Sequence, residues 1–63
     1  MIYENVKRLC DEKGLSIMAL EKEAGLSNGT VGGWRTATPS AVSLQKVAVV
    51  LGVSMEELMK EAT

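Results

Sequence analysis

The side chains best suited to specific polar contacts lie in the middle of this sequence of 63 residues. Asn28 can form a two-pronged hydrogen bond with an adenine edge, and Arg35 can bond a phosphate. Residues 24–55 contain no Asp or Glu, and their only charges are those of Arg35 and Lys46. This stretch therefore carries +2 within a chain of net charge −1, and all eight acids lie in residues 4–23 and 56–61. The pattern indicates a weakly basic central surface.

Side chains for catalysis or metal binding are scarce. The sequence has no histidine, which is the commonest general base and metal ligand, and Cys10 is its single cysteine. A disulfide within the chain and a zinc site built on cysteines are therefore excluded. Glu56 and Glu57 could be taken for a metal pair, but acids in a first helical turn are typical of capping. We therefore expect that the protein is not an enzyme and that it binds no cofactor and no small-molecule substrate.

The length allows one domain, residues 1–63, with a modest core that pairing with a second copy would reinforce. The longest apolar run, residues 47–51, is too short to cross a membrane, and we expect no secretory signal. A single cysteine suits a reducing cytoplasm, which is the expected location.

Hydrophobic spacing predicts an all-α fold of five short helices. Ile2, Val6, Leu9 and Cys10 form one helical stripe that Gly14 ends. A second helix begins after Ser16, carries Leu20 and Ala24 inward, and ends at Gly25. Ser27 can cap a third helix, with Val31 and Trp34 inward.

A fourth helix begins at Ser40, or at Thr38 with Pro39 in the first helical position. Its apolar face consists of Ala41, Leu44, Val47, Ala48 and Leu51. Gly52 ends it, and a capping box of Ser54 and Glu57 begins a fifth that buries Leu58.

The order of these signals resembles the Cro and phage-repressor type of helix-turn-helix protein, with its lambda-repressor-like (XRE-like) fold. The resemblance covers nearly the full chain. Its helix-turn-helix, about residues 16–35, rests on Leu15-Ser16, Leu20, Ala24-Gly25-Leu26-Ser27, Thr30-Val31 and Trp34. The later helices match at Pro39-Ser40, Leu44, Val47-Ala48, Leu51-Gly52-Val53-Ser54 and Leu58.

The resemblance implies double-stranded DNA as partner, with the third helix in the major groove. Carried over by position, Asn28, Gly29 and Gly33 face bases, Thr30 lies near the backbone or groove wall, and Ser27 caps the helix whose start faces DNA. Family members hold phosphates at the start of the second helix, where this chain has Ile17, which cannot bond a phosphate, and in the loop after the third helix, which is Arg35, Thr36 and Thr38 here. The DNA-binding residues are thus Ser27, Asn28, Gly29, Thr30, Gly33, Arg35, Thr36 and Thr38.

Each of these residues also has a purely structural interpretation. Asn28 could only support the cap at Ser27, Arg35 could be a solvated charge, and Thr36 and Thr38 could be ordinary loop residues. Trp34 could stack on a base, although its phase with Val31 places it in the core. Cys10, on the inward stripe, is expected to be a small buried hydrophobe.

Three departures from the family pattern bear on affinity. Ile17 stands where a phosphate-bonding glutamine is common, Glu21 replaces a small residue, and Gly32 and Gly33 replace Ser and a long polar or basic residue. Each helical glycine costs about 1 kcal/mol relative to Ala. The sequence therefore predicts modest intrinsic specificity, in part from DNA shape, that depends on dimerisation.

The chain also has more apolar residues than a solitary domain of this kind needs, among them Ile17, Met18, Val42 and Val49. An exposed apolar cluster would mark an interface. Family members commonly pair around the fourth and fifth helices, so we expect a homodimer through Val49, Val53, Met55 or Met59.

Two functions remain open. The first is a sequence-specific DNA-binding transcriptional regulator, most simply a prokaryotic or phage repressor. The alternative is a protein-interaction or antitoxin-like module on a helix-turn-helix scaffold with weak or no DNA binding. The missing glutamine, the acidic balance and the glycine-rich third helix favour the alternative, and the ordered motif favours the first.

Overall fold

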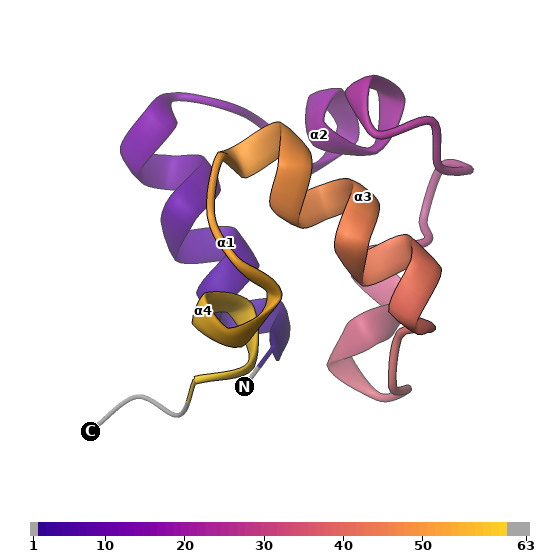
Figure 1. The fold of residues 1–63 in the computed structure, drawn as a ribbon. Helices are drawn as coiled ribbons and strands as arrows, with labels where there is room; N and C mark the ends of the chain where they lie inside the picture. The colour runs from indigo at the N-terminus through magenta and orange to yellow at the C-terminus, as the bar shows by residue number, and fades with distance from the viewer. Residues whose placement is uncertain (1, 61–63) are drawn as a thin grey trace.

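A computed structural model describes residues 2–60, and this part of the chain contains helices and no strand. It has four α-helices, α1 (Ile2–Lys13), α2 (Ile17–Glu23), α3 (Ala41–Leu51) and α4 (Met55–Met59), and one 3₁₀ helix, η1 (Gly32–Arg35) (Figure 1). The all-helical class is confirmed; of the five short helices expected, four are α-helices, and the 3₁₀ helix η1 stands in place of the third. None of these helices is long and apolar enough to span a membrane.

Serine caps set the starts of the last three α-helices where the sequence predicts them. The hydroxyls of Ser16, Ser40 and Ser54 accept hydrogen bonds from the amides three residues later, at 3.0, 3.1 and 3.1 Å. Each satisfies one of the amides that a helix start leaves without a partner. The capping box at Ser54 forms only through the serine, because the exposed Glu57 side chain does not return a bond within the described structure.

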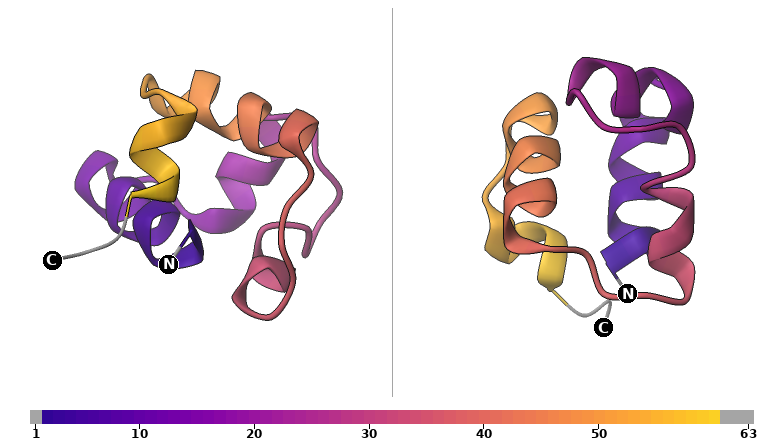
Figure 2. Two further views of the ribbon diagram at one scale, coloured as in Figure 1. Left: turned by 60° about the horizontal axis from the view of Figure 1, so that its bottom comes forward. Right: turned by 90° about the vertical axis from the view of Figure 1, so that its right-hand side faces the viewer.

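The helices form two layers closed at one end. Seen from the side, α3 and α4 lie on one side and α1 and η1 on the other, with α2 bridging the top (Figure 2). Accordingly, α1 packs against α2, η1 and α4, whereas α3 packs against α2 and α4. The glycine after α3, Gly52, has a φ of +71°, a left-handed conformation that ends the helix and turns the chain into α4.

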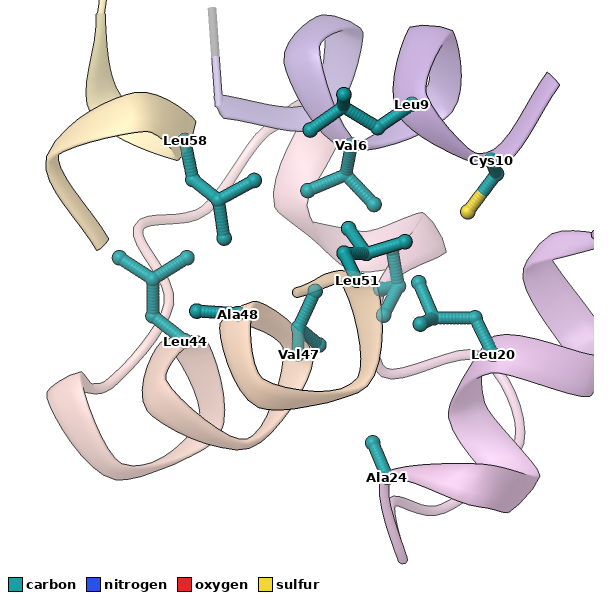
Figure 3. Close-up of a cluster of buried hydrophobic side chains, with 11 residues drawn as sticks. Val6, Leu9, Cys10, Leu20, Ala24, Leu44, Val47, Ala48, Leu51 and Leu58 are labelled. Carbon is teal, nitrogen blue, oxygen red and sulfur yellow. The ribbon is translucent and has the colours of Figure 1, made fainter. Parts of the chain in front are cut away.

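The core lies between these layers and follows the predicted stripes closely. Figure 3 shows Leu58 of α4 directed toward Val6 of α1 and Leu44 of α3, with Leu51 near the centre. Trp34 is half-buried and packs on this core, as expected, but Ala41 is exposed, so the predicted apolar face of α3 begins one turn late. The buried hydrophobic residues are Val6, Leu9, Cys10, Leu20, Ala24, Val31, Leu44, Val47, Ala48, Leu51 and Leu58.

A buried asparagine that the sequence analysis did not single out holds α4 to α1. The Nδ2 atom of Asn5 donates to the carbonyl oxygens of Leu58 at 2.8 Å and of Lys60 at 2.5 Å. These carbonyls lie at the end of α4, where no later turn of helix supplies an amide. Asn5 thus gives α4 the C-terminal partner that its five residues lack.

Replacing Asn5 by alanine is expected to lower the free energy of unfolding by about 1–3 kcal/mol, because two carbonyls at the end of α4 lose their donor. Urea denaturation followed by circular dichroism measures this loss. The matched control is Asn28→Ala, which removes an exposed amide and should change stability by no more than about 0.5 kcal/mol. Equal stabilities for the two variants would contradict the role of Asn5.

Burial, aided by the charge of Asp11, raises the pKa of the Cys10 thiol above its ordinary value. Because unfolding restores the ordinary pKa of about 8.5, the unfolded chain loses this proton first as the pH rises. The protonated Cys10 thiol should make its full contribution to the free energy of unfolding below about pH 8.5. This contribution should decrease progressively as the pH rises further. Cys10→Ala should lose less stability between pH 7 and 9.5 than the parent chain; identical losses would contradict the prediction.

Candidate nucleic-acid interface

The stretch between α2 and α3, which contains the positions predicted to face bases, is not the helix expected over residues 27–35. Residues 28–31 form turns, and η1 follows them. The amides of Thr30 and Trp34 bond carbonyls three residues back, at Ser27 and Val31, whereas Gly33 bonds Gly29, four residues back. The prediction of one continuous helix at 27–35 is therefore wrong, because turns and a 3₁₀ helix take its place. We call residues 28–35 the reading segment.

Glycine explains this irregular backbone. Gly29 has a φ of +91°, which lies outside the right-handed helical region and interrupts the helix next to Asn28. Gly32 and Gly33 follow within η1, and each glycine costs about 1 kcal/mol relative to Ala in a helix. The segment consequently has little helical stability of its own and takes its shape from its contacts.

The main polar contact comes from Glu21, on α2. Its carboxylate is buried, with 3% of the residue exposed, and accepts hydrogen bonds from the amide of Gly29 at 3.0 Å and from the amide of Val31 at 2.7 Å. Ser27 was expected to cap this segment with its hydroxyl, but it contributes only its carbonyl, which accepts from Thr30 at 3.1 Å. The cap is therefore supplied from α2 and not from the chain just before the segment.

Sequence analysis noted Glu21 only as a departure from the family pattern. A signal for its role was present, since Glu21 directly follows the inward Leu20 and precedes a stretch with three glycines. A buried carboxylate must be bonded or paired, and free backbone amides are a suitable partner.

The proposed contact residues are mostly exposed and lie within residues 27–38, where they are interrupted by the buried Val31 and the half-buried Gly32 and Trp34. Thr30 is half-buried, whereas the other seven are exposed: Ser27, Asn28, Gly29, Gly33, Arg35, Thr36 and Thr38. Asn28 borders a surface hollow of about 310 Å³ that Met18, Glu21, Lys22 and Leu26 also line. The stretch thus offers polar groups beside an apolar recess, a combination suited to the edges and methyl groups of bases.

Ile17 does not belong to this surface in the way the resemblance implies. It is half-buried and packs against the core from the first turn of α2. Its apolar side chain therefore has a structural reason to replace a phosphate-bonding glutamine.

Arg35 lies where η1 meets α1. Its Nε atom donates to the carbonyl of Gly32 at 3.2 Å, and its guanidinium carbon lies 5.3 Å from the centre of the Tyr3 ring. A cation over an aromatic face at this distance contributes about 0.5–1 kcal/mol at an exposed site. The two contacts orient the guanidinium, and its terminal nitrogens make no hydrogen bond within residues 2–60.

Two of the acids that line a surface hollow together with Arg35 face basic side chains on α1. On α1, Lys7 bonds Asp11 at 2.7 Å and Arg8 faces Glu12 at 3.6 Å. The hydrogen bond with Asp11 raises the pKa of Lys7. Because these acids already face lysine or arginine on their own helix, the positive charge of Arg35 is opposed less than the net charge suggests.

The residues proposed for dimerisation divide into two groups. Val49 on α3 and Met59 on α4 are exposed, with 68% and 48% of their surface accessible. Val53 and Met55 are half-buried and pack on the core of their own chain. Only the first pair is fully free for contact with another molecule.

Comparison with known proteins agrees with this arrangement. The family model for the Cro/C1-type HTH DNA-binding domain matches residues 5–61, which is nearly the full chain. A comparison with curated protein sequences gives no match. The match spans α2, the reading segment and the two helices after it, and this chain therefore belongs to the Cro/C1-type helix-turn-helix DNA-binding family.

Proposed function

We propose that this protein is a sequence-specific double-stranded DNA-binding regulator of transcription, and that it acts as a repressor. The observation that carries the proposal is the set of exposed polar residues within the acid-free stretch 27–38, which follows α2 after a short turn in a chain of the Cro/C1 family. The proposed place of action is the cytoplasm, where prokaryotic or phage DNA lies. Repression requires only that the bound protein occupy the site and exclude others.

In this proposal the reading segment enters the major groove. The Asn28 amide bonds an adenine through N6 and N7, a contact worth about 1–3 kcal/mol of discrimination. Gly29 and Gly33 have no side chain to read a base, but they let the backbone approach the DNA closely, so part of the specificity follows DNA shape. Thr30 lies at the groove wall.

Phosphate contacts position the segment. Arg35 is held against Tyr3 with its terminal nitrogens available, and the exposed hydroxyls of Thr36 and Thr38 follow it. Phosphate contacts supply affinity that falls as salt rises, because each one releases a counterion. With few cations available, a single copy binds weakly.

A homodimer supplies what one copy lacks. We propose that it forms through the α3–α4 face, around the exposed Val49 and Met59, with Val53 and Met55 at its edge. Val42, 66% exposed and seven residues before Val49, lies on the same side of α3. Two-fold pairing would space two reading segments about 34 Å apart along one face of the duplex.

A protein-interaction or antitoxin-like role is the second candidate. It is favoured by the irregular reading segment and by a net charge of −1, which weakens attraction to DNA. In that case the reading segment would be a scaffold feature, and no duplex would bind even at low salt.

The DNA proposal is tested by selecting duplexes from a random pool and titrating the winner by fluorescence anisotropy at several salt concentrations. Asn28→Ala should reduce the discrimination between bases at one position of the duplex by about 1–3 kcal/mol, because the Asn28 amide is proposed to bond a base edge there. Arg35→Ala should reduce the log–log salt slope by about 0.9, because it removes one phosphate contact. The absence of any enriched duplex and of any binding at low salt would overturn the proposal in favour of a partner module.

Dimerisation is tested by sedimentation velocity up to high micromolar concentration. Val49→Lys should give only monomer and weaken binding to a symmetric duplex, because a charge would be buried in the proposed interface. Met18→Lys is the matched control for the sedimentation measurement only, since Met18 is 66% exposed on α2 and outside the α3–α4 face, but it borders the hollow beside Asn28. A parent chain that stays monomeric throughout would contradict the dimer.

A further inference from the structure

We propose that Glu21 is the positioning residue of the DNA-reading surface: its buried carboxylate sets the backbone shape of the reading segment and thereby the sequence preference of the protein. This inference rests on the proposed function, because it assigns a role within the same surface. Glu21 itself faces inward and does not touch DNA in this proposal.

The Glu21 carboxylate bonds the amides on both sides of one residue, and we call this pair of hydrogen bonds the bridge. One carboxylate oxygen accepts from Gly29 and the other from Val31, so the two bonds enclose Thr30. Two bonds from one rigid group fix the direction of the chain between them, which a single bond cannot do. The residues on either side of the first bond, Asn28 and Thr30, are those whose side chains face the groove.

Glu21 also holds the turn that precedes the segment. Its own carbonyl accepts from the amide of Leu26 at 2.8 Å. One residue therefore bonds the chain both before and within the region that carries Asn28. Any residue at position 21 would make this backbone bond, whereas the two bonds within the segment require the carboxylate.

The carboxylate is itself held by rigid surroundings. Glu21 lies in α2 between the fully buried Leu20 and the buried Ala24, and α2 is capped by Ser16. At the other end, Val31 is fully buried in the core. The bridge therefore links two fixed points, and the flexible glycine at position 29 takes up the conformation that the link imposes.

The same bonds exclude a different role for these amides. Free amides at the start of a helix commonly hold a phosphate. Here the amides of Gly29 and Val31 already bond a carboxylate, so they are not donors for DNA. The contribution of this region to binding is consequently its shape and the orientation of Asn28, and loss of Glu21 should alter sequence preference more than general affinity.

The first test is amide hydrogen exchange of the free, full-length chain by NMR. Glu21→Gln preserves the volume but places an amide nitrogen, a donor, opposite one of the two backbone donors. We expect exchange at Gly29 and Val31 to become about tenfold faster, while the amide of Leu51 in the core is little changed. Glu23→Gln removes an exposed carboxylate from the same helix and should leave all three rates unaltered.

The second test compares binding to the selected duplex with binding to random duplex. We define the ratio as the affinity for the selected duplex divided by the affinity for random duplex. Glu21→Gln should lower this ratio about tenfold relative to Glu23→Gln. Its affinity for random duplex and its salt slope should match those of Glu23→Gln. Glu23→Gln is needed because loss of any negative charge near DNA raises affinity. If Glu21→Gln does not fold, Glu21→Asp carries the test, since it keeps the charge but its shorter side chain cannot reach both amides.

The outcomes separate this inference from the proposed function. An unchanged preference and unchanged exchange at Gly29 and Val31 would overturn the role of Glu21 even if the parent chain binds DNA. If the parent chain binds no duplex, the proposed function fails and with it the effect on preference. Faster exchange in Glu21→Gln would then still support the bridge as the feature that orders the segment.

Discussion

A helix of five or seven residues is not stable alone in water, because nucleation costs more than so few hydrogen bonds return. This constraint governs the structure, since α4 has five residues, α2 has seven and η1 has four. Each must therefore be held by burial and by partners for its terminal groups. The fully buried Leu20 and Leu58 attach α2 and α4 to a common core, and burial of one such side chain contributes about 1.5–3 kcal/mol.

Within residues 2–60, the two buried polar residues meet the same constraint, one at the end of a helix and the other near the start of the reading segment. Asn5 supplies donors to the last carbonyls of α4, and Glu21 supplies acceptors to the first amides of the reading segment. In both cases a side chain on a longer or better-capped helix supplies hydrogen-bond partners for the backbone of a short helical segment nearby. Buried polar groups are costly unless bonded, so each pair of bonds accounts for the burial of its residue.

The local signals on which the fold depends could be predicted from the sequence. Serine caps, glycine stops and apolar spacing placed four helices and nearly all of the core, because these effects act within a few residues. The irregular segment at 28–35 was missed although its three glycines are local signals against a helix, because the bonds that fix its backbone come from a carboxylate eight to ten residues away in sequence. Asn5 escaped notice for the same reason: its partners lie more than fifty residues further along the chain.

The partners of individual acids also change how the charge of this protein should be understood. A net charge of −1 argues against a nucleic-acid partner if every acid is counted equally. Asp11 and Glu12, however, face Lys7 and Arg8 on their own helix, and Glu21 is buried against two amides. Beyond about 8 Å, solvent-exposed charges are screened at physiological salt, so the local balance around Arg35 matters more than the sum over the chain. An acid placed within a DNA-binding motif is thus compatible with DNA binding when backbone amides bond its carboxylate.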